Sequence, residues 1–235
     1  GAFPRSRRPS HEEGIVKEQR TTFLRQSLIL GAVLAVAIPL FVASLTPPAF
    51  AQTIVDEWAT VKAPAAPELK PVPLPNVNET AYLVLDIQKQ NCVPRPRCVA
   101  SVPKIQKLLA DARAKGMAVV HSTFTGNVAD ILPEAAPRAG EPVVSSGPDK
   151  FVGTDLEKIL KEKGIKTVIA VGTAAHGAVL YTVSGAVYRG FKAIVPVDGM
   201  AAENTYIEQY VTYQLASGPR LGPAVTLTKF DLIKF

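Results

Sequence analysis

Residues 167–181, TVIAVGTAAHGAVLY, constrain the fold more than any other segment of this chain. An apolar run reaches Gly172, passes through small residues and enters a helical pattern near His176. A strand that feeds a helix through so tight a turn directs backbone N–H groups into one small space, where they can hold an anion. The segment therefore predicts a strand, an anion-binding turn and a helix.

Strand and helix patterns alternate along most of the remaining sequence. Short runs rich in Val, Ile and Leu predict buried strands, and segments with apolar residues at helical spacing predict helices. The predicted strands are 81–87, 117–123, 143–145, 167–171, 192–197 and 224–228. The predicted helices are 102–115, 155–163, 176–189 and 203–216. This alternation predicts a three-layer α/β/α fold, with a mostly parallel central sheet and helices on both faces.

Charged residues follow two other apolar runs at points that match the small-residue turn. Asp86 stands near the carboxyl end of the strand predicted at 81–87, and Lys150 follows the sequence Ser-Ser-Gly-Pro-Asp at 145–149. Ligands of open α/β sheets bind beyond the carboxyl ends of the strands. We therefore expect Asp86, Lys150 and the turn at 172–178 to share one cavity.

Residues 1–51 have the pattern of an N-terminal extension with an export signal. Two arginines precede an uncharged run of 19 residues, 27–45, and the sequence Ala-Phe-Ala at 49–51 offers small residues at the two positions that signal cleavage requires. We expect Gln52 to be the mature N-terminus of a periplasmic or secreted protein. An uncleaved membrane anchor is the competing interpretation, since about 20 apolar residues span a bilayer. The protein would contact a membrane only through this segment.

Residues 52–77 have the composition of a proline-rich arm. Five prolines between positions 64 and 75 are spaced so that neither a helix nor a strand interior can persist. The 184 residues after position 51 suffice for one domain with a buried sheet and are too few for two ordinary domains. We assign the domain to residues 78–235.

The basic composition does not indicate nucleic-acid binding. The chain has 26 Lys or Arg and 20 Asp or Glu, but residues 1–51 hold six of the basic and three of the acidic side chains, which leaves a net charge of +3. No run of basic residues with interleaved aromatic residues appears. The sequence predicts a small-molecule partner and no nucleic acid.

Both cysteines, Cys92 and Cys98, lie in one short polar loop, QKQNCVPRPRC. In an oxidising compartment this spacing favours a local disulfide. A zinc site is an alternative that lacks support, because the histidines at 11, 121 and 176 supply no second ligand pair at recognisable spacing. A catalytic thiol at Cys92 is the other alternative, and it would have to be reduced. We expect no metal and no cofactor.

Several motifs resemble those of the isochorismatase-like hydrolases, a superfamily that also contains nicotinamidases and other cysteine hydrolases. The run LVLDIQ at 83–88 resembles the Asp-x-Gln strand of the family, and Lys150 followed by Phe151 resembles its lysine segment. The run GTAAHGAVL at 172–180 resembles its nucleophile turn. The resemblance covers about residues 78–217 and implies a hydrolase domain. Family members are often oligomers, so a homo-oligomer is one assembly that the resemblance allows.

The sequence departs from the cysteine hydrolases at the nucleophile. In those members a cysteine closes the turn and attacks the substrate, and alignment puts it at position 178, where this chain has Ala178. No Ser, Thr or Cys stands at 177 or 179 to replace it, so acyl-enzyme chemistry is excluded. True isochorismatases hydrolyse a vinyl ether without a covalent enzyme intermediate, and Ala175-His176 followed by Ala178 is similar to their turn.

The resemblance implies a role for each remaining site residue. Asp86 becomes the general acid, and Lys150 becomes the partner of a substrate carboxylate or of developing negative charge. Ala174, Ala175 and His176 form the substrate and oxyanion side of the pocket. In the family the peptide bond that matches Ala174 to Ala175 is commonly cis, which turns amides of the turn inward.

The acid role places a demand on the electrostatics of the site. An aspartic acid that is protonated near pH 7 needs its pKa raised by about 3 units, roughly 4 kcal/mol, through burial or a nearby anion. Lys150 would oppose that rise if it lay beside Asp86. Ordinary structural interpretations remain open as well: Asp86 as a strand-end carboxylate, Lys150 as a solvated side chain and His176 as the first residue of its helix.

Two classes of function follow from these observations. The first is an exported isochorismatase-like hydrolase of a small anionic substrate that lacks a cysteine nucleophile and uses Asp86 as acid or base with support from Lys150. The alternative is a catalytically inactive family member that acts as a ligand-binding protein. Isochorismate is a cytoplasmic metabolite, so the export signal argues against it as the natural substrate.

Overall fold

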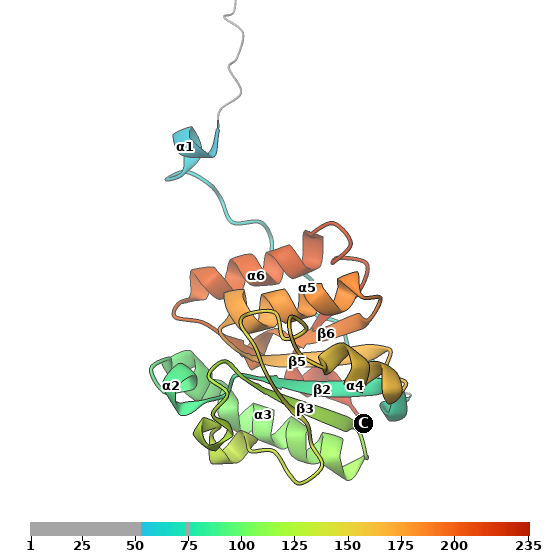
Figure 1. Ribbon diagram of the computed structural model, residues 1–235. Helices are drawn as coiled ribbons and strands as arrows, with labels where there is room; N and C mark the ends of the chain where they lie inside the picture. Colours follow the sequence, from blue (N-terminus) through green and yellow to red (C-terminus); the bar gives the residue numbers. More distant parts are fainter. Residues whose placement is uncertain (1–52, 74–75) are drawn as a thin grey trace, which may run out of the picture. The chain divides into compact units, whose positions relative to one another are not determined.

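The computed structural model of the protein describes residues 53–73 and 76–235 (Figure 1). The chain divides into a unit of residues 1–59 and a unit of residues 60–235. The described part of the first unit contains the short helix α1 (Ile54–Glu57). The predicted export signal lies outside the described residues, and within the described ranges no helix has the length and apolar character needed to cross a membrane.

A parallel sheet forms the centre of the second unit. In the part of the chain that the structure describes, its strands lie in the order β4-β3-β2-β5-β6-β8, and the two-residue strand β7 also pairs with β5. The strands are β2 (Thr80–Leu85), β3 (Ala118–Thr123), β4 (Val143–Ser145), β5 (Thr167–Thr173), β6 (Lys192–Pro196), β7 (Met200–Ala201) and β8 (Val225–Thr228). The pairs between them are parallel, which confirms the predicted sheet type. The strand order reverses between β2 and β5, and such a reversal is where open α/β sheets bind ligands.

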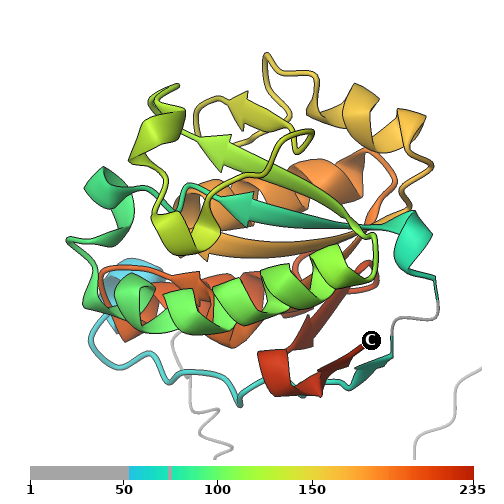
Figure 2. The ribbon, with the colours of Figure 1, turned by 90° about the horizontal axis from the view of Figure 1, so that it is seen from below.

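Helices cover both faces of this sheet, as predicted (Figures 1 and 2). The longer helices are α3 (Pro96–Ala114), α4 (Leu156–Glu162), α5 (Leu180–Tyr188) and α6 (Thr205–Ser217). Alternate side chains of β2 point to opposite faces. Leu83 and Leu85 therefore belong to the hydrophobic cluster with α4, α5 and α6, whereas Tyr82 and Val84 belong to the cluster with α3. The three-layer α/β/α architecture is confirmed.

Two of the predicted helices begin more than two residues from their predicted starts, whereas α4 and α6 begin within two residues of theirs. Helix α3 starts six residues before the predicted start at 102, because Pro96 occupies its first turn, where the missing N–H is not needed, and Pro103 is accommodated inside the helix. The helix predicted from 176 starts as a π-helical turn, Ala175–Val179, which continues as α5. Strand β5 continues two residues past its predicted end.

The end of the proline-rich arm belongs to the folded domain. Strand β1 (Val72–Pro73) pairs in parallel with β9 (Ile233–Lys234). The Lys70 N–H donates to the Leu227 carbonyl oxygen at 2.9 Å, and the Thr228 hydroxyl donates to the Lys70 carbonyl oxygen at 2.7 Å. The prediction of an arm without strand structure does not hold for these last residues, because β9 pairs with β1 and the edge strand β8 supplies partners for the backbone groups of Lys70.

Candidate active site

Asp86 directly follows β2 at the carboxyl end of the sheet, beside β5. Its backbone has φ 53°, in the left-handed region that residues other than glycine rarely adopt. The residue is only 4% exposed. Buried residues in such unfavourable backbone conformations cluster at functional sites, so Asp86 is a candidate functional residue.

The Asp86 carboxylate is held from two sides. Lys150 Nζ lies 2.8 Å from Oδ2, and the Ser122 hydroxyl donates to Oδ1 at 2.7 Å. The Lys150 side chain is fully buried and also donates to the Ser146 carbonyl oxygen at 2.9 Å. The structure thus brings together two of the predicted site residues in a buried ion pair.

Helix α5 positions the turn that carries Lys150. The backbone N–H of Lys150 donates to Thr182 Oγ1 at 3.2 Å, and the Thr182 hydroxyl donates to the Pro148 carbonyl oxygen at 3.3 Å. The turn also packs against Gly185, where an added Cβ would lie 2.7 Å from an Asp149 carboxylate oxygen. Glycine at this position lets the turn that carries Lys150 approach helix α5 closely, because a side chain there would collide with Asp149.

The small-residue turn lies next to the end of β2 because β2 and β5 are paired. Leu85 and Gly172 are register partners, and a Cβ on Gly172 would lie 2.0 Å from the Leu85 carbonyl oxygen. A cis peptide bond joins Thr173 to Ala174. The resemblance implied a cis bond between Ala174 and the next residue; the observed bond is one position earlier, directly after the end of β5.

The turn itself contains the other predicted site residues. Ala175 and Ala178 are buried in the π-helical turn, and a methyl group at position 178 cannot attack a substrate. His176 is partly exposed, with Nδ1 4.0 Å from Glu203 Oε2 and without a hydrogen-bond partner among the described residues. The turn therefore offers backbone groups and one imidazole, but no nucleophilic side chain at the family position.

Burial raises the pKa of Asp86, and although Lys150 and Ser122 act in the opposite direction, the pKa remains above its ordinary value. Removal of a carboxylate from water disfavours its charged form, whereas a nearby ammonium group favours it. Lys150 does lie beside Asp86, as considered from the sequence, and it does not cancel the effect of burial. The direction of the shift is the one that a general acid requires.

Cys92 and Cys98 form a disulfide in the structure, with their Cα atoms 5.2 Å apart. Both cysteines are fully buried, and the part of the chain that the structure describes contains no free cysteine. In this state neither sulfur can act as a thiolate nucleophile or as a metal ligand. The disulfide closes the loop that follows Asp86.

His121 belongs to a different buried cluster. Its Nε2 lies 2.9 Å from Glu141 Oε2, and Glu141 also accepts hydrogen bonds from the side chain of Arg113 and from the Arg138 N–H. Burial lowers the pKa of His121. Burial by itself raises the pKa of Glu141, but its hydrogen bonds outweigh burial and lower that pKa to about 2. This arrangement supports a structural role for His121.

Ser122, Ser146 and Asn91 contact the site but were not predicted. Alternation along β3 puts Ser122 on the face opposite His121, and β3 pairs with β2, so the strand-end argument applied to Asp86 would have found it. Ser146 contributes only its carbonyl oxygen, which no side-chain pattern signals. Asn91 lies in the short helix α2 (Lys89–Cys92), directly before the first cysteine of the disulfide, and carries no local signal.

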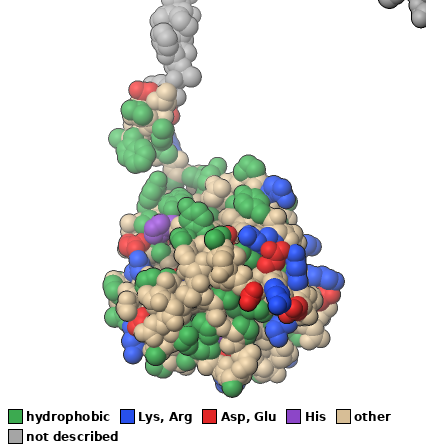
Figure 3. Space-filling model, in the orientation of Figure 1, with side chains coloured by type: hydrophobic (Ala, Val, Ile, Leu, Met, Phe, Trp, Pro, Cys, Tyr) green, Lys and Arg blue, Asp and Glu red, His purple; other side chains and the backbone are tan. Residues whose placement is uncertain are grey.

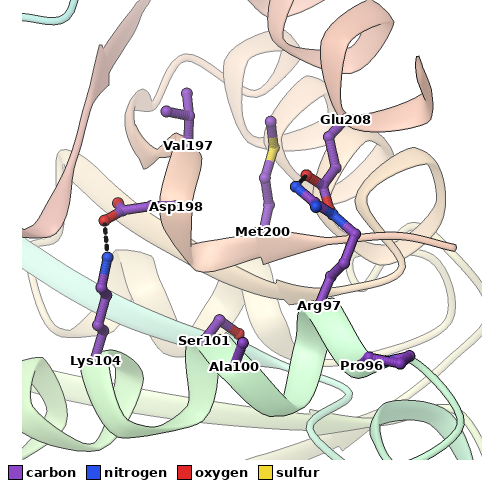
Figure 4. A pocket seen from close by; sticks show the side chains of 9 residues that line it. All are labelled: Pro96, Arg97, Ala100, Ser101, Lys104, Val197, Asp198, Met200 and Glu208. Atoms are coloured by element: carbon purple, nitrogen blue, oxygen red, sulfur yellow. Dashed lines mark hydrogen bonds and ion pairs between the residues drawn. The ribbon is translucent and has the colours of Figure 1, made fainter. Parts of the chain in front are cut away.

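A cavity of about 530 Å³ lies elsewhere, between α3, the segment before α6, and α6 itself (Figure 4). It is lined by Pro96, Arg97, Ala100, Ser101, Lys104, Val197, Asp198, Met200 and Glu208. Figure 4 shows its charged side chains paired with one another, Lys104 with Asp198 and Arg97 with Glu208. The charged side chains of this cavity are partly exposed, whereas Asp86 and Lys150 are buried at the carboxyl end of the sheet, so the Asp86 and Lys150 pair is the better candidate for chemistry.

The face drawn in Figure 3 carries basic and acidic side chains close together around α4. Lys161 and Glu157 pair at 2.6 Å on that helix, and Lys166 pairs with Glu79 at 2.6 Å. A nucleic-acid-binding face instead gathers charge of one sign. This face does not have that character.

Comparison with known proteins places these observations in a family. Residues 80–228 match the family model of the isochorismatase domain. The chain is 35% identical over 113 residues to the secreted isochorismatase effector Isc1 of Verticillium dahliae, a match that covers 43% of this chain and 60% of that protein. It is 30% identical over 150 residues to the uncharacterized isochorismatase family protein YddQ of Bacillus subtilis, covering 56% of this chain and 83% of that protein.

Solved structures share the fold. The structure of an isochorismatase family protein from Desulfovibrio vulgaris superposes with a TM-score of 0.60 at 19% identity, covering 65% of this chain and 95% of that one. The match to Isc1 spans less than two thirds of that relative, so it is the family model, which covers more than half of the chain, that carries the assignment. On this evidence the chain belongs to the isochorismatase family of hydrolases.

Proposed function

We propose that this protein is an exported hydrolase of a small anionic substrate that forms no covalent enzyme intermediate. The observation that carries the proposal is the buried contact between Asp86 and Lys150, next to a turn with alanine at the nucleophile position. A carboxyl group with a raised pKa suits proton donation, and the absence of a nucleophile at position 178 leaves water to attack the substrate.

Asp86 acts as the general acid in this proposal. For a vinyl ether, the alkene electron pair takes the Asp86 proton at the terminal carbon, and an oxocarbenium ion remains. Water adds to that cation and returns a proton to the Asp86 carboxylate. The resulting hemiketal collapses to a ketone and an alcohol, so Asp86 is ready for another turnover and no bond to the protein has formed.

Lys150 supports the two charge states of Asp86. In the free protein its ammonium group stabilises the carboxylate. A substrate anion that approaches Lys150 shares this positive charge, which raises the pKa of Asp86 and favours uptake of the proton. The backbone N–H groups of Ala174 and Ala178 stabilise negative charge on the substrate.

A ligand-binding protein without turnover is the second candidate. Lys150 and Ser122 already occupy both oxygens of the Asp86 carboxylate, as they would in a purely structural ion pair. A family member that had lost its nucleophile would retain the turn and the ion pair but not the chemistry.

The variant Asp86→Asn distinguishes the two candidates because it keeps the shape of the side chain and removes the transferable proton. Hydrolysis of vinyl ethers is expected to fall by about 100-fold or more, while substrate affinity measured by calorimetry changes little. Asp198→Asn is the matched control, because Asp198 also forms an ion pair with a lysine, Lys104, at 2.8 Å. Absence of turnover by the unmodified protein across vinyl ethers, amides and esters would favour the binding protein.

The variant Ala178→Cys tests the turn separately. If the backbone of the turn still stabilises an oxyanion, the new thiol is expected to give amidase activity, measured as ammonia release from simple amides. Asp86 and Lys150 would serve the thiol as they serve water in the proposal. An inactive Ala178→Cys protein that folds normally would count against an oxyanion role for the turn.

Export is supported by the N-terminal sequence and by a relative. The uncharged run at 27–45 and the small residues at 49–51 match a cleavable signal. The relative Isc1 is described as secreted, and disulfides such as that of Cys92 and Cys98 persist mainly in oxidising compartments. Expression of the full chain in bacteria, followed by N-terminal sequencing of the periplasmic product, is expected to give Gln52. Full-length protein retained in the membrane fraction would instead identify an anchor.

A further inference from the structure

We propose that Asn91 is a positioning residue that holds the two halves of the candidate site in register. Asn91 Nδ2 donates to the Thr173 carbonyl oxygen at 2.9 Å and to the Asp86 carbonyl oxygen at 3.3 Å. One amide group therefore connects the end of the strand that carries the acid with the residue that precedes the turn. The inference rests on the proposed function only in treating Asp86 as the acid.

The position of the Asp86 carboxyl depends on how its peptide groups are held. A residue with φ 53° is under strain, and relaxation toward ordinary values would redirect its side chain. The Asp86 N–H donates to Ser122 Oγ at 3.2 Å, and the Asp86 carbonyl oxygen accepts from the Gln88 N–H at 2.8 Å and from Asn91 Nδ2 at 3.3 Å. Of these three contacts only the one from Asn91 also ties Asp86 to Thr173, so its loss would free the end of β2 from the turn and change the approach of the carboxyl to Lys150.

Asn91 is itself fixed in orientation. Arg95 donates to Asn91 Oδ1 at 2.6 Å and to the Asn91 carbonyl oxygen, while its Nε donates to Glu203 Oε1 at 2.8 Å. Because Arg95 has only donors, Oδ1 must face it, and Nδ2 must face the two carbonyl oxygens. The disulfide between Cys92 and Cys98 closes the loop that carries Arg95.

A structural asparagine and a positioning asparagine predict different results. A structural role in the loop predicts that truncation of Asn91 lowers the stability of the protein and leaves the environment of the Asp86 carboxyl unchanged. A positioning role predicts that this environment changes as well, since both the burial of the carboxyl and its contact with Lys150 depend on where it lies.

The experiment is a titration of the Asp86 carboxyl by carbon-13 NMR, with Asp86→Asn used to assign the signal. Asn91→Ala is expected to move the titration midpoint by about half a unit or more. Asn76→Ala is the matched control at the opposite end of β2, because the Asn76 side chain also bonds to a backbone group, the Asn78 N–H at 3.2 Å. The control is expected to lower the melting temperature without moving the midpoint. An unchanged midpoint in Asn91→Ala overturns the proposal.

A second variant keeps the proposal testable if Asn91→Ala does not fold. Arg95→Gln leaves the amide in place but removes the group that orients it, and it is also expected to move the Asp86 midpoint. An unchanged midpoint in that variant then overturns the proposal. The titration needs no substrate, so its outcome is independent of whether the protein hydrolyses a vinyl ether. With a substrate in hand, Asn91→Ala is expected to lower kcat with little change in KM.

Discussion

Replacement of Lys150 by methionine removes the cation of the ion pair at the centre of the candidate site. The Lys150 side chain is fully buried, and its Nζ lies 2.8 Å from Asp86 Oδ2. Methionine has a similar length and no charge, so the variant leaves a buried carboxylate without its partner. Removal of one member of a buried pair costs about 3 to 5 kcal/mol of unfolding free energy. For a domain of this size, that loss lowers the melting temperature by roughly 10 °C.

The size of this loss depends on pH through Asp86. Burial raises the pKa of Asp86 and Lys150 lowers it, so the pKa rises further in Lys150→Met. The folded variant then binds a proton more tightly than the unfolded chain, for which the ordinary value is 3.8. Stability falls as the pH rises from that value through the folded pKa. The deficit of the variant relative to the wild type is therefore smallest below pH 4 and largest at neutral pH.

Urea unfolding followed by circular dichroism at pH 4 and pH 8 measures this deficit. Lys166→Met is the matched control, because Lys166 pairs with Glu79 at 2.6 Å with 71% of its side chain exposed, and it should cost less than about 1 kcal/mol. A deficit in Lys150→Met that is absent, or equal at both pH values, refutes the reasoning. The double variant Asp86→Asn/Lys150→Met should recover part of the loss, since it leaves no lone charge.

Other predictions concern the stability of the fold and the electrostatics of the site. Burial alone would raise the pKa of Glu141, but Arg113 and other donors lower it to about 2, so the carboxylate stabilises the fold above pH 4.5. Solvent partly screens this group, so its contribution is on the order of 1 to 3 kcal/mol; it is lost as the pH falls toward 2, where the stability of Glu141→Gln in urea unfolding should approach that of the wild type. Gly172→Ala places a Cβ 2.0 Å from the Leu85 carbonyl oxygen, and a loss of more than about 4 kcal/mol is expected in thermal melting. Ser122→Ala removes a donor to the acid, which should raise the pKa of that carboxyl in an NMR titration and cost about 1 to 3 kcal/mol.

Each of these predictions has an outcome that contradicts it. A Glu141→Gln protein with the acid sensitivity of the wild type would show that the carboxylate does not stabilise the fold. For Gly172→Ala the control is Gly116→Ala, where φ is 70° but no atom lies within 4 Å of the added Cβ, so only backbone strain of about 1 kcal/mol or slightly more is expected. Equal losses of stability in Gly172→Ala and Gly116→Ala would contradict the expectation that the nearby Leu85 carbonyl oxygen makes the first substitution more costly. An Asp86 pKa that falls in Ser122→Ala would contradict the role of that hydroxyl.

The layers of the fold could be predicted because each buried strand is a near-continuous apolar run. The segments at 81–87 and 167–171 have this character, and the helices between strands end at glycines. Element ends were harder to predict. Pro96 and Pro103 lie within α3, and the sequence around a proline does not by itself show whether a helix can include that proline. The two-residue strands β1 and β9 depend on contacts between the two ends of the domain, which no local pattern signals.

The site could be predicted in part from the topology of the sheet. Asp86 and Lys150 follow strands whose carboxyl ends share one edge, so their proximity was an expectation from the sequence. Their direct contact was not, because no sequence pattern shows how the two side chains approach each other. Arg95 contacts both Asn91 and Glu203. Because Glu203 is more than 100 positions from the other two residues, no local sequence pattern indicates this group.

The contacts of Lys70 have a practical consequence for handling the protein. Strand β8 is the last strand of the sheet, and Lys70 satisfies the outward-facing carbonyl oxygen of Leu227. A recombinant fragment that starts at residue 78 would lack this cover and present a bare sheet edge to other molecules. Exposed edges of this kind recruit strands from neighbouring copies and lead to aggregation. Expression of the domain should therefore begin upstream of Lys70, so that each molecule shields its own edge.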